Sequence, residues 1–288
     1  MKTELQSETA YLIEQFKQHL LLQGKEESTV KLYSTELSHF LNWLDRMNKT
    51  LSSIEEEDIF ASRDELYLSG KRLSTINKYV SILATFFRWA ERQGMVKGNP
   101  AASARYHSPK STELPRWLTE DEEARLLEIA AKERNPFKRA RNEALIHVLL
   151  YAGLRVEEVP HLRLSSVGMG ELKVFDDAGK LLRIVPVAPQ TYSKLAVWLE
   201  ERSTADKETY NNSSYLFVTE RSGAMQARAV QFVIQAYASK LGSDFSCHDL
   251  RNTYCRRLAE IRTPILHLKQ WAGHKSFLTT YQYYAGLQ

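Results

Sequence analysis

The chain has 288 residues, 43% of them hydrophobic and 26% charged, and a net charge of +4. This composition is typical of a soluble globular protein, and the length predicts two domains that each bury a core. The sequence shows no apolar run long enough to cross a bilayer, and its N-terminus lacks the apolar core of a secretion signal, so we expect a cytoplasmic protein. The two cysteines, Cys247 and Cys255, are too few for a disulfide framework or a zinc site.

The positive charge is concentrated near the C-terminus. Residues 1–105 hold 14 basic and 14 acidic residues, whereas residues 245–288 hold six basic residues and two acids. Binding to a polyanion such as DNA requires a local basic excess of this kind. On charge alone, a solvated basic face explains the pattern equally well.

The first hundred residues carry apolar side chains at three- and four-residue steps, which predicts a bundle of four helices. Ser or Thr residues are expected as N-caps of two of them. The four helices are expected over Tyr11–Leu22, after Ser28 and Thr29, after Ser53, and after Ser74 and Thr75. Gly94 and the Gly98-Asn99-Pro100 stretch then end the last helix.

A linker is expected at residues 103–116, which contain two prolines and no apolar periodicity. It separates an N-terminal domain over residues 1–102 from a second domain over residues 117–288. The second domain opens with Thr119-Glu-Asp-Glu122, a capping box at the start of a helix.

The apolar pattern changes from helix to strand within the second domain. An apolar helix over residues 139–152 stops at Gly153, and a second helix is expected to start around Arg155. Two short strands are then expected around the turn at residues 176–180. Strands are predicted at residues 172–175, 181–187 and 215–218, and helices after Pro189 and over residues 227–241. The fold class is therefore mainly α: a four-helix N-terminal domain joined to a mixed α+β domain with a small antiparallel sheet.

Two short motifs carry side chains suited to a bound anion. His248 and Arg251 are three residues apart, so on a helix they share a face, and arginine offers a planar fork to phosphate oxygens. Arg155 follows Gly153 at a helix junction, where Glu158 can orient it. Taken singly, a surface coincidence explains the first motif and an ordinary ion pair explains the second.

The ordered set of motifs is more specific than any member. Gly-Leu-Arg155 is followed by a hairpin with Lys180, by His248-x-x-Arg251, by His274, and by Tyr283 nine residues later. With these motifs the chain resembles the tyrosine recombinase family, which includes the phage integrases and the Xer-type enzymes. The matching segments are YAGLRVEEV, HDLRNTY, WAGHKS, TTYQYY, STVKLYSTELSHFLNWL and STINKYVSILATFFRWAERQGMVKGNP.

The resemblance implies a site-specific recombinase that cuts and rejoins DNA through a 3′-phosphotyrosine intermediate. It implies a SAM-like core-binding domain before the linker and a catalytic domain after it. It further implies no metal or other cofactor and no ATP, a double-stranded DNA recombination site as substrate, a homotetramer in the synaptic complex, and accessory DNA-bending or partner proteins. We expect the enzyme on DNA of the nucleoid, in integration or in resolution of a mobile element or replicon.

The resemblance also implies a role for each motif residue. Arg155 and Arg251 would clamp the scissile phosphate, with Glu158 supporting Arg155, and His248 would transfer a proton. His274 would hydrogen-bond the phosphate or the attacking oxygen. Tyr283 would be the nucleophile.

The chain departs from the family pattern at the lysine that protonates the leaving oxygen. Asp176 and Asp177 occupy the stretch where the family places that lysine, and we favour Lys180 over Lys173 because of its position in the turn. Pro160 interrupts a stretch that the family continues as a helix.

The C-terminal segment contains two further tyrosines, and Tyr281 and Tyr284 are interpreted as packing or hydrogen-bonding residues. Only five residues follow Tyr283, so the contact between protomers stays open. Two alternatives also stay open: a DNA-binding protein of the same fold without cleavage activity, and a transesterase resembling type IB topoisomerases.

Overall fold

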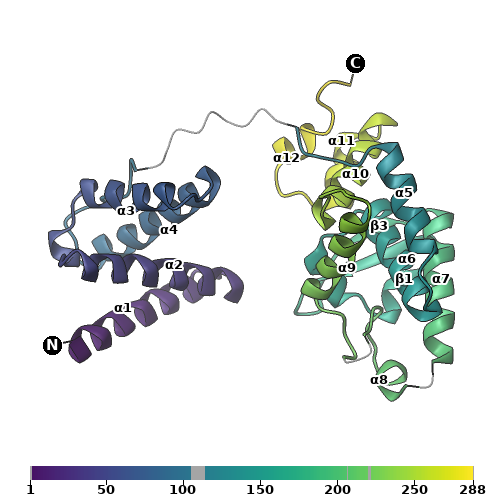
Figure 1. Cartoon of the computed structure of the whole chain (residues 1–288), viewed down its shortest axis with the longest axis horizontal. Coiled ribbons are helices and arrows are strands. Elements are labelled where there is room, and N and C mark those ends of the chain that lie inside the picture. The colour runs from purple at the N-terminus through teal and green to yellow at the C-terminus, as the bar shows by residue number, and fades with distance from the viewer. Residues whose placement is uncertain (1, 105–113, 206, 220–221, 288) are drawn as a thin grey trace. The chain divides into compact units, whose positions relative to one another are not determined.

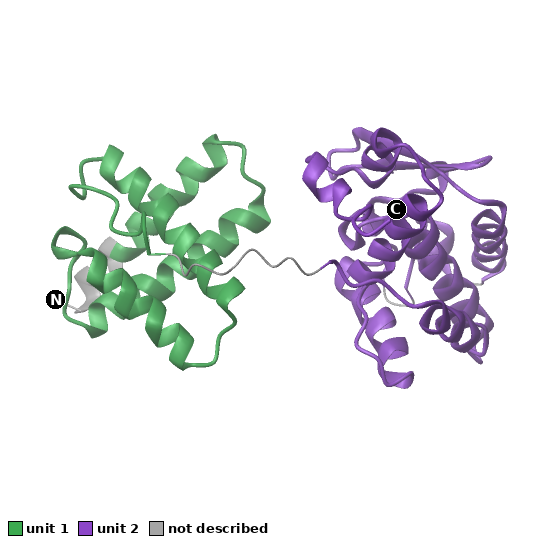
Figure 2. Cartoon of the chain, turned by 90° about the horizontal axis from the view of Figure 1, so that it is seen from above, with its two compact units in different colours: residues 1–112 green, residues 113–288 purple. Residues whose placement is uncertain are grey.

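A computed structural model describes residues 2–104, 114–205, 207–219 and 222–287. The chain divides into two units, residues 1–112 and residues 113–288 (Figure 2). Most of the predicted linker, residues 103–116, falls on residues 105–113, which lie outside the described residues. No helix in the described ranges is long and apolar enough to span a membrane.

Unit 1 is the expected bundle of four helices (purple to blue in Figure 1). The helices are α1 (Lys2–Leu22), α2 (Glu27–Arg46), α3 (Glu56–Leu68) and α4 (Leu73–Arg92), with a 3-10 turn, η1, at Leu51–Ser53. Aromatic side chains from three of the helices form the core. Phe86 meets Phe16 and Phe87 edge to face, and Phe87 does the same with Phe40. These rings are fully buried, so the apolar periodicity in the sequence marks the core-facing side of α1, α2 and α4.

The predicted N-caps of α2 and α4 are wrong. The preceding helices end in tight turns in which Gly24 and Gly70 have a left-handed backbone conformation. Glu26 and Arg72 are extended and act as the N-cap positions, so α2 and α4 begin at the residue that follows each of them. The residues predicted as caps therefore lie inside the first turns: Ser28, Thr29, Ser74 and Thr75.

Unit 2 is built around α6 (Pro136–Tyr151), a helix whose residues 140–150 are almost all buried. It contacts α5, α7, α9 and α10 (Figure 1), and this explains why its sequence is apolar without a clear polar face. The other helices are α5 (Glu120–Ala131), η2 (Val156–His161), η3 (Leu164–Ser166), α7 (Pro189–Thr204), α8 (Glu208–Asn211), α9 (Ala227–Lys240), α10 (Cys247–Glu260), α11 (Ile265–Ala272) and α12 (Phe277–Tyr281). The capping box that opens α5 is present, since Thr119 and Glu122 exchange both hydrogen bonds.

The small sheet is antiparallel, with strand order β1 (Val167–Gly168), β2 (Glu171–Phe175) and β3 (Leu181–Pro186). The predicted hairpin is β2–β3, and β1 is a short strand that the sequence did not indicate. Val174 pairs with Arg183 and both are buried, whereas the next pair, Lys173 and Ile184, lies on the more exposed face. Alternation along β3 therefore points an arginine toward the interior.

The strand predicted at residues 215–218 is wrong. Tyr215 forms only an isolated bridge with Arg163. Two backbone hydrogen bonds, from Leu216 to Leu162 and from Leu164 to Ser214, hold the segment beside the loop after η2. The apolar side chains of this stretch are buried, but the backbone forms no β-ladder. A short buried apolar segment outside a sheet therefore has the same sequence pattern as a strand.

Candidate active site

Arg155 is placed by a tight turn between α6 and η2. Gly153 ends α6 with a φ of 62°, and a Cβ atom at this position would overlap the ring of Tyr254 on α10. The predicted α-helix after the turn is instead the 3-10 helix η2, with Pro160 inside it. Proline lacks the N–H that an α-helical hydrogen bond requires. The N–H groups of Glu158 and Leu162, on either side of Pro160, donate to carbonyls three residues earlier, as in a 3-10 helix.

Glu158 holds Arg155 in this turn. The Arg155 backbone N–H donates to the Glu158 Oε2 atom at 2.7 Å, and the Arg155 Nη1 atom donates to Oε1 at 3.0 Å. Arg155 is half-buried, and its Nη2 atom donates to the carbonyl of Gly273. The guanidinium is thus fixed on two sides and keeps part of its surface open.

His248 and Arg251 lie one turn apart on α10. Ser246 caps this helix, with its N–H and Oγ both 2.8 Å from Asp249 Oδ2. His248 is exposed, whereas Arg251 is buried and donates to the carbonyls of Gly153 and Ala272.

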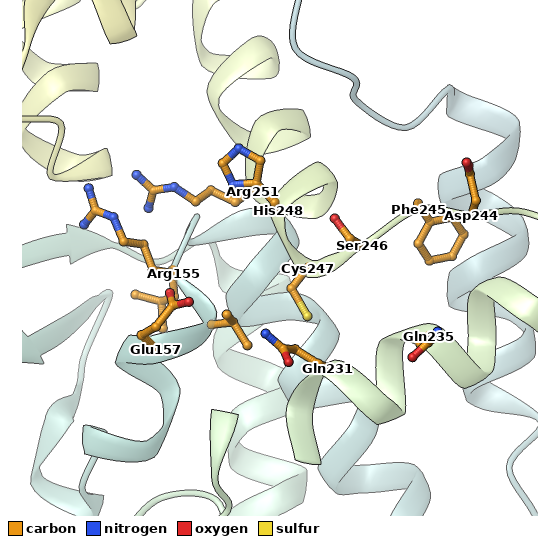
Figure 3. Close-up of a pocket in the computed structure, with 12 residues that line it drawn as sticks. Arg155, Glu157, Gln231, Gln235, Asp244, Phe245, Ser246, Cys247, His248 and Arg251 are labelled. Carbon is orange, nitrogen blue, oxygen red and sulfur yellow. The ribbon is translucent and has the colours of Figure 1, made fainter. Parts of the chain in front are cut away.

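A cavity of about 600 Å³ opens beside these residues. Arg155, His248 and Arg251 line one end of it, and Gln231 of α9 and Phe245 lie farther along (Figure 3). Two guanidinium groups and an imidazole at one end of a cavity have the charge and the hydrogen-bond donors that suit a phosphate group.

His274 follows directly on the end of α11. It is 8% exposed, and its Nδ1 atom lies 3.1 Å from Thr280 Oγ1. Burial and the neighbouring arginines Arg251 and Arg155 lower its pKa to about 4, so the ring is neutral at pH 7. A neutral imidazole can donate one hydrogen bond and accept another but adds no charge to the site.

Tyr283 lies in the turn after α12, stacked on His274 with ring centroids 5.9 Å apart. Its side chain is 2% exposed, and its hydroxyl donates to Asn252 Oδ1 at 2.7 Å. Burial, reinforced by Cys255, raises its pKa to about 12. Tyr283 is not among the described residues that line the cavity. The structure therefore brings Tyr283 to His274 and to α10, where its hydroxyl is bonded to Asn252 and lies outside the lining of the cavity.

Two family models match this chain. The sequence model of the phage integrase family matches residues 116–288, and the model of the phage integrase N-terminal SAM-like domain matches residues 13–94. The chain belongs to the phage integrase family. Its relatives carry the name tyrosine recombinase, so the recognition made from the motifs is confirmed, and the chain is a site-specific DNA recombinase.

The similarity extends over nearly the whole chain. Tyrosine recombinase XerA of Thermococcus kodakarensis is 27% identical over 96% of this chain and 91% of its own length. Tyrosine recombinase XerC of Leptospira interrogans is 25% identical over 89% of this chain and 82% of its own length. The alternatives of a non-cleaving DNA-binding protein and a type IB topoisomerase are not favoured.

Solved structures share the fold. The Tn1549 transposon integrase in complex with circular intermediate DNA has a TM-score of 0.76 at 18% identity, covering 96% of each chain. A lambda integrase dimer bound to a COC′ core site has a TM-score of 0.72 at 18% identity, covering 97% of this chain and 78% of that one. The expected fold class is confirmed.

The two lysines of the recombinase hairpin lie in different surroundings. Lys173 is on the outer face of β2, with its ammonium 3.7 Å from Glu171. Lys180 is exposed at the end of the turn, where its N–H donates to Asp176 Oδ1 at 2.8 Å. Neither is among the described residues that line the cavity. His161 Nε2 of η2 lies 3.0 Å from Asp177 Oδ1 in this turn.

The two neighbouring tyrosines differ from Tyr283. Tyr281 is 64% exposed, and the hydroxyl of half-buried Tyr284 donates to the carbonyl of Thr263. Tyr284 thus packs and bonds as expected, whereas Tyr281 is not packed.

Sequence reasoning missed Arg183 and Asn252, which contact the predicted site residues. Arg183 bonds Glu158, and Asn252 accepts the Tyr283 hydroxyl. A signal for the first was present, because an arginine at a core-facing position of a strand requires a buried carboxylate partner. Asn252 carries no comparable signal, since its role depends on where the C-terminal turn lies.

Proposed function

We propose that the recombinase cuts DNA by attack of the Tyr283 oxygen on a phosphate bound between Arg155 and Arg251. The observation that carries this proposal is the convergence of Arg155, His248 and Arg251 on one cavity. A diester phosphate is anionic, and two guanidinium groups stabilise the additional charge of the pentavalent transition state. The arginines thus supply charge that a metal ion supplies in other phosphoryl-transfer enzymes.

The chemical step has a simple balance. The Tyr283 oxygen forms a bond to phosphorus while the bond to the 5′ oxygen breaks, which leaves a 3′-phosphotyrosine and a free 5′ hydroxyl. The phenol proton passes to His248, and Lys180 gives a proton to the leaving oxygen. Rejoining reverses the step with a new 5′ hydroxyl, so the diester energy is kept and ATP is not needed.

The buried phenol has to move before it can attack. Tyr283 is bonded to Asn252, and a phenol with a pKa of about 12 is a poor nucleophile at neutral pH. Leaving this pocket for the side of the arginines would remove the burial that raises its pKa and strengthen the effect of Arg251, which already lowers that pKa. We therefore propose that DNA binding rearranges the turn after α12.

Further parts of the proposal concern the whole assembly. We assign residues 1–102 to core binding and residues 117–288 to catalysis, and we infer a homotetramer on two DNA duplexes, with accessory proteins at some sites. The Tn1549 transposon integrase and lambda integrase structures hold DNA, which supports a double-stranded recombination site as the substrate. We place the enzyme on nucleoid DNA in the cytoplasm, acting in integration or in resolution of a mobile element or replicon.

Covalent capture tests the proposed reaction. A duplex with the recombination site, nicked so that the cut fragment diffuses away, should leave the chain joined to DNA through denaturing electrophoresis. The adduct should form in the presence of EDTA and without ATP. A bound site that never yields an adduct would contradict the proposal.

The assignment of Lys180 predicts a specific chemical rescue. Lys180→Ala should slow cleavage of ordinary DNA by about 100-fold, a typical contribution of a general acid. It should leave cleavage near the wild-type rate when sulfur replaces the bridging 5′ oxygen, because a thiol with a pKa of about 8.5 leaves without a proton. Lys173→Ala is the matched control. If the sulfur substrate rescues Lys173→Ala and not Lys180→Ala, the acid is Lys173.

A further inference from the structure

Three arginines from three separate elements bind three consecutive carbonyl groups at the end of α11. Arg183 of β3 donates from Nε to the Trp271 carbonyl at 2.7 Å, Arg251 donates to Ala272, and Arg155 donates to Gly273. The last carbonyls of a helix lack partners within it and carry the negative end of its dipole, so cations are favoured there. His274 is the next residue. The end of α11 therefore fixes the two proposed phosphate ligands, Arg155 and Arg251, and His274 follows them in the chain. Arg183 is the third arginine bound at this helix end.

Of the two arginines that bind Glu158, Arg183 makes more side-chain hydrogen bonds to it than Arg155 does. Its side chain is 5% exposed, and Nη1 and Nη2 bind the two carboxylate oxygens of Glu158 as a fork. Glu158 Oε1 is shared, because Arg155 Nη1 also donates to it. A Cβ atom added at Gly273 would come within 3.1 Å of both Arg155 Nη1 and Arg183 Nη1, so the two guanidinium groups meet over this glycine.

The shared carboxylate controls how much of the Arg155 charge is free. Arg155, Glu158 and Arg183 together carry one net positive charge. Without Arg183, Arg155 and Glu158 would be a neutral pair, and the lone pairs that Arg183 occupies on both carboxylate oxygens would be free to accept a second side-chain bond from Arg155. Such a pair would turn Arg155 toward Glu158 and weaken its hold on an anion at the cavity.

We propose that Arg183 is a positioning residue for strand cleavage, which keeps Arg155 directed at the scissile phosphate by occupying Glu158 and the end of α11. This role rests on the proposed function, since it presumes that Arg155 binds that phosphate. Arg183 itself does not touch the DNA.

A neutral phosphate analogue separates positioning from folding. Single-turnover cleavage is measured for the wild-type chain and Arg183→Met on a nicked site with an ordinary scissile phosphate, and on the same site with a methylphosphonate there. On the ordinary phosphate we expect Arg183→Met to be about 10- to 100-fold slower, the cost of a misplaced catalytic group. On the methylphosphonate, which has no charge for Arg155 to bind, the deficit should shrink to less than about threefold. An equal deficit on both substrates would overturn the positioning role and leave a structural one.

A second variant keeps the test valid if Arg183→Met folds poorly. Arg183→Met with Glu158→Gln removes the buried carboxylate that would otherwise lose its partner. If Glu158 captures Arg155 in the single variant, the double variant should cleave the ordinary phosphate several-fold faster than the single one at equal folded fraction, measured by thermal unfolding. No gain in the double variant would contradict the charge explanation.

The result for the wild-type chain separates a failure of the role of Arg183 from a failure of the proposed function on which that role rests. No adduct from the wild-type chain on the ordinary phosphate would overturn the proposed function, and the role of Arg183 with it. A wild-type adduct together with a wild-type rate for Arg183→Met would overturn the role of Arg183 alone.

Discussion

Tyr283→Phe should abolish covalent capture of a nicked recombination site. Phenylalanine keeps the ring that stacks on His274 but lacks the oxygen that joins phosphorus. The measurement is the fraction of labelled DNA that stays with the chain in denaturing electrophoresis. Because the step cannot proceed without a nucleophile, we expect no adduct at any time point.

The neighbouring tyrosines provide matched controls for this variant. Tyr281 is 64% exposed, and Tyr284 bonds the Thr263 carbonyl, so neither shares the pocket of Tyr283. Tyr281→Phe and Tyr284→Phe should both form the adduct at close to the wild-type level. If Tyr281→Phe formed no adduct while Tyr283→Phe still formed one, the nucleophile would be Tyr281 and not Tyr283.

Loss of folding does not explain the expected result. The Tyr283 hydroxyl donates a hydrogen bond to Asn252, and leaving that buried acceptor unpaired costs about 1–3 kcal/mol of the free energy of unfolding. A domain with a core of this size tolerates that change. Binding of Tyr283→Phe to the uncut site should therefore equal that of the wild-type chain, which a gel-shift titration checks.

Local periodicity made much of the fold predictable from the sequence. Helices α2 and α4 each present one apolar stripe, and the hairpin between β2 and β3 alternates around a glycine turn, so the positions of their core residues follow directly. The capping box at Thr119 was predictable for the same reason, because both partners are within one turn. Helix starts set by the end of the preceding helix, as at Glu26 and Arg72, were not predictable from the Ser and Thr pattern.

The sequence predicted which residues belong to the candidate site better than it predicted how these residues are arranged. The order of Arg155, His248 and Arg251 matched a family, and the structure brings these three residues to one cavity. The burial of Tyr283 against Asn252 depends on contacts between segments about 30 residues apart, which no local pattern encodes. The same is true of Arg183, whose partners Glu158 and Trp271 lie on other elements.

Arg251→Lys should slow strand cleavage by about 100- to 1,000-fold, the usual cost of removing one donor from a preorganised anion site. The Arg251 guanidinium bridges the carbonyls of Gly153 and Ala272 at the end of the cavity. Lysine keeps the positive charge but has neither the reach nor the planar fork to bind two carbonyls and a phosphate together. The measurement is the single-turnover rate of adduct formation at saturating DNA.

Arg257→Lys is the matched control on the same helix. Arg257 also bonds a carbonyl, that of Leu150, and it pairs with Glu123 on α5, but it is not among the described residues that line the cavity. It should lose some stability and keep a cleavage rate near that of the wild-type chain. If Arg251→Lys and Arg257→Lys were slowed equally, the effect would belong to the packing of α10. A slow Arg251→Lys beside a fast Arg257→Lys would assign the lost rate to the phosphate clamp, because both changes remove the same fork from the same helix.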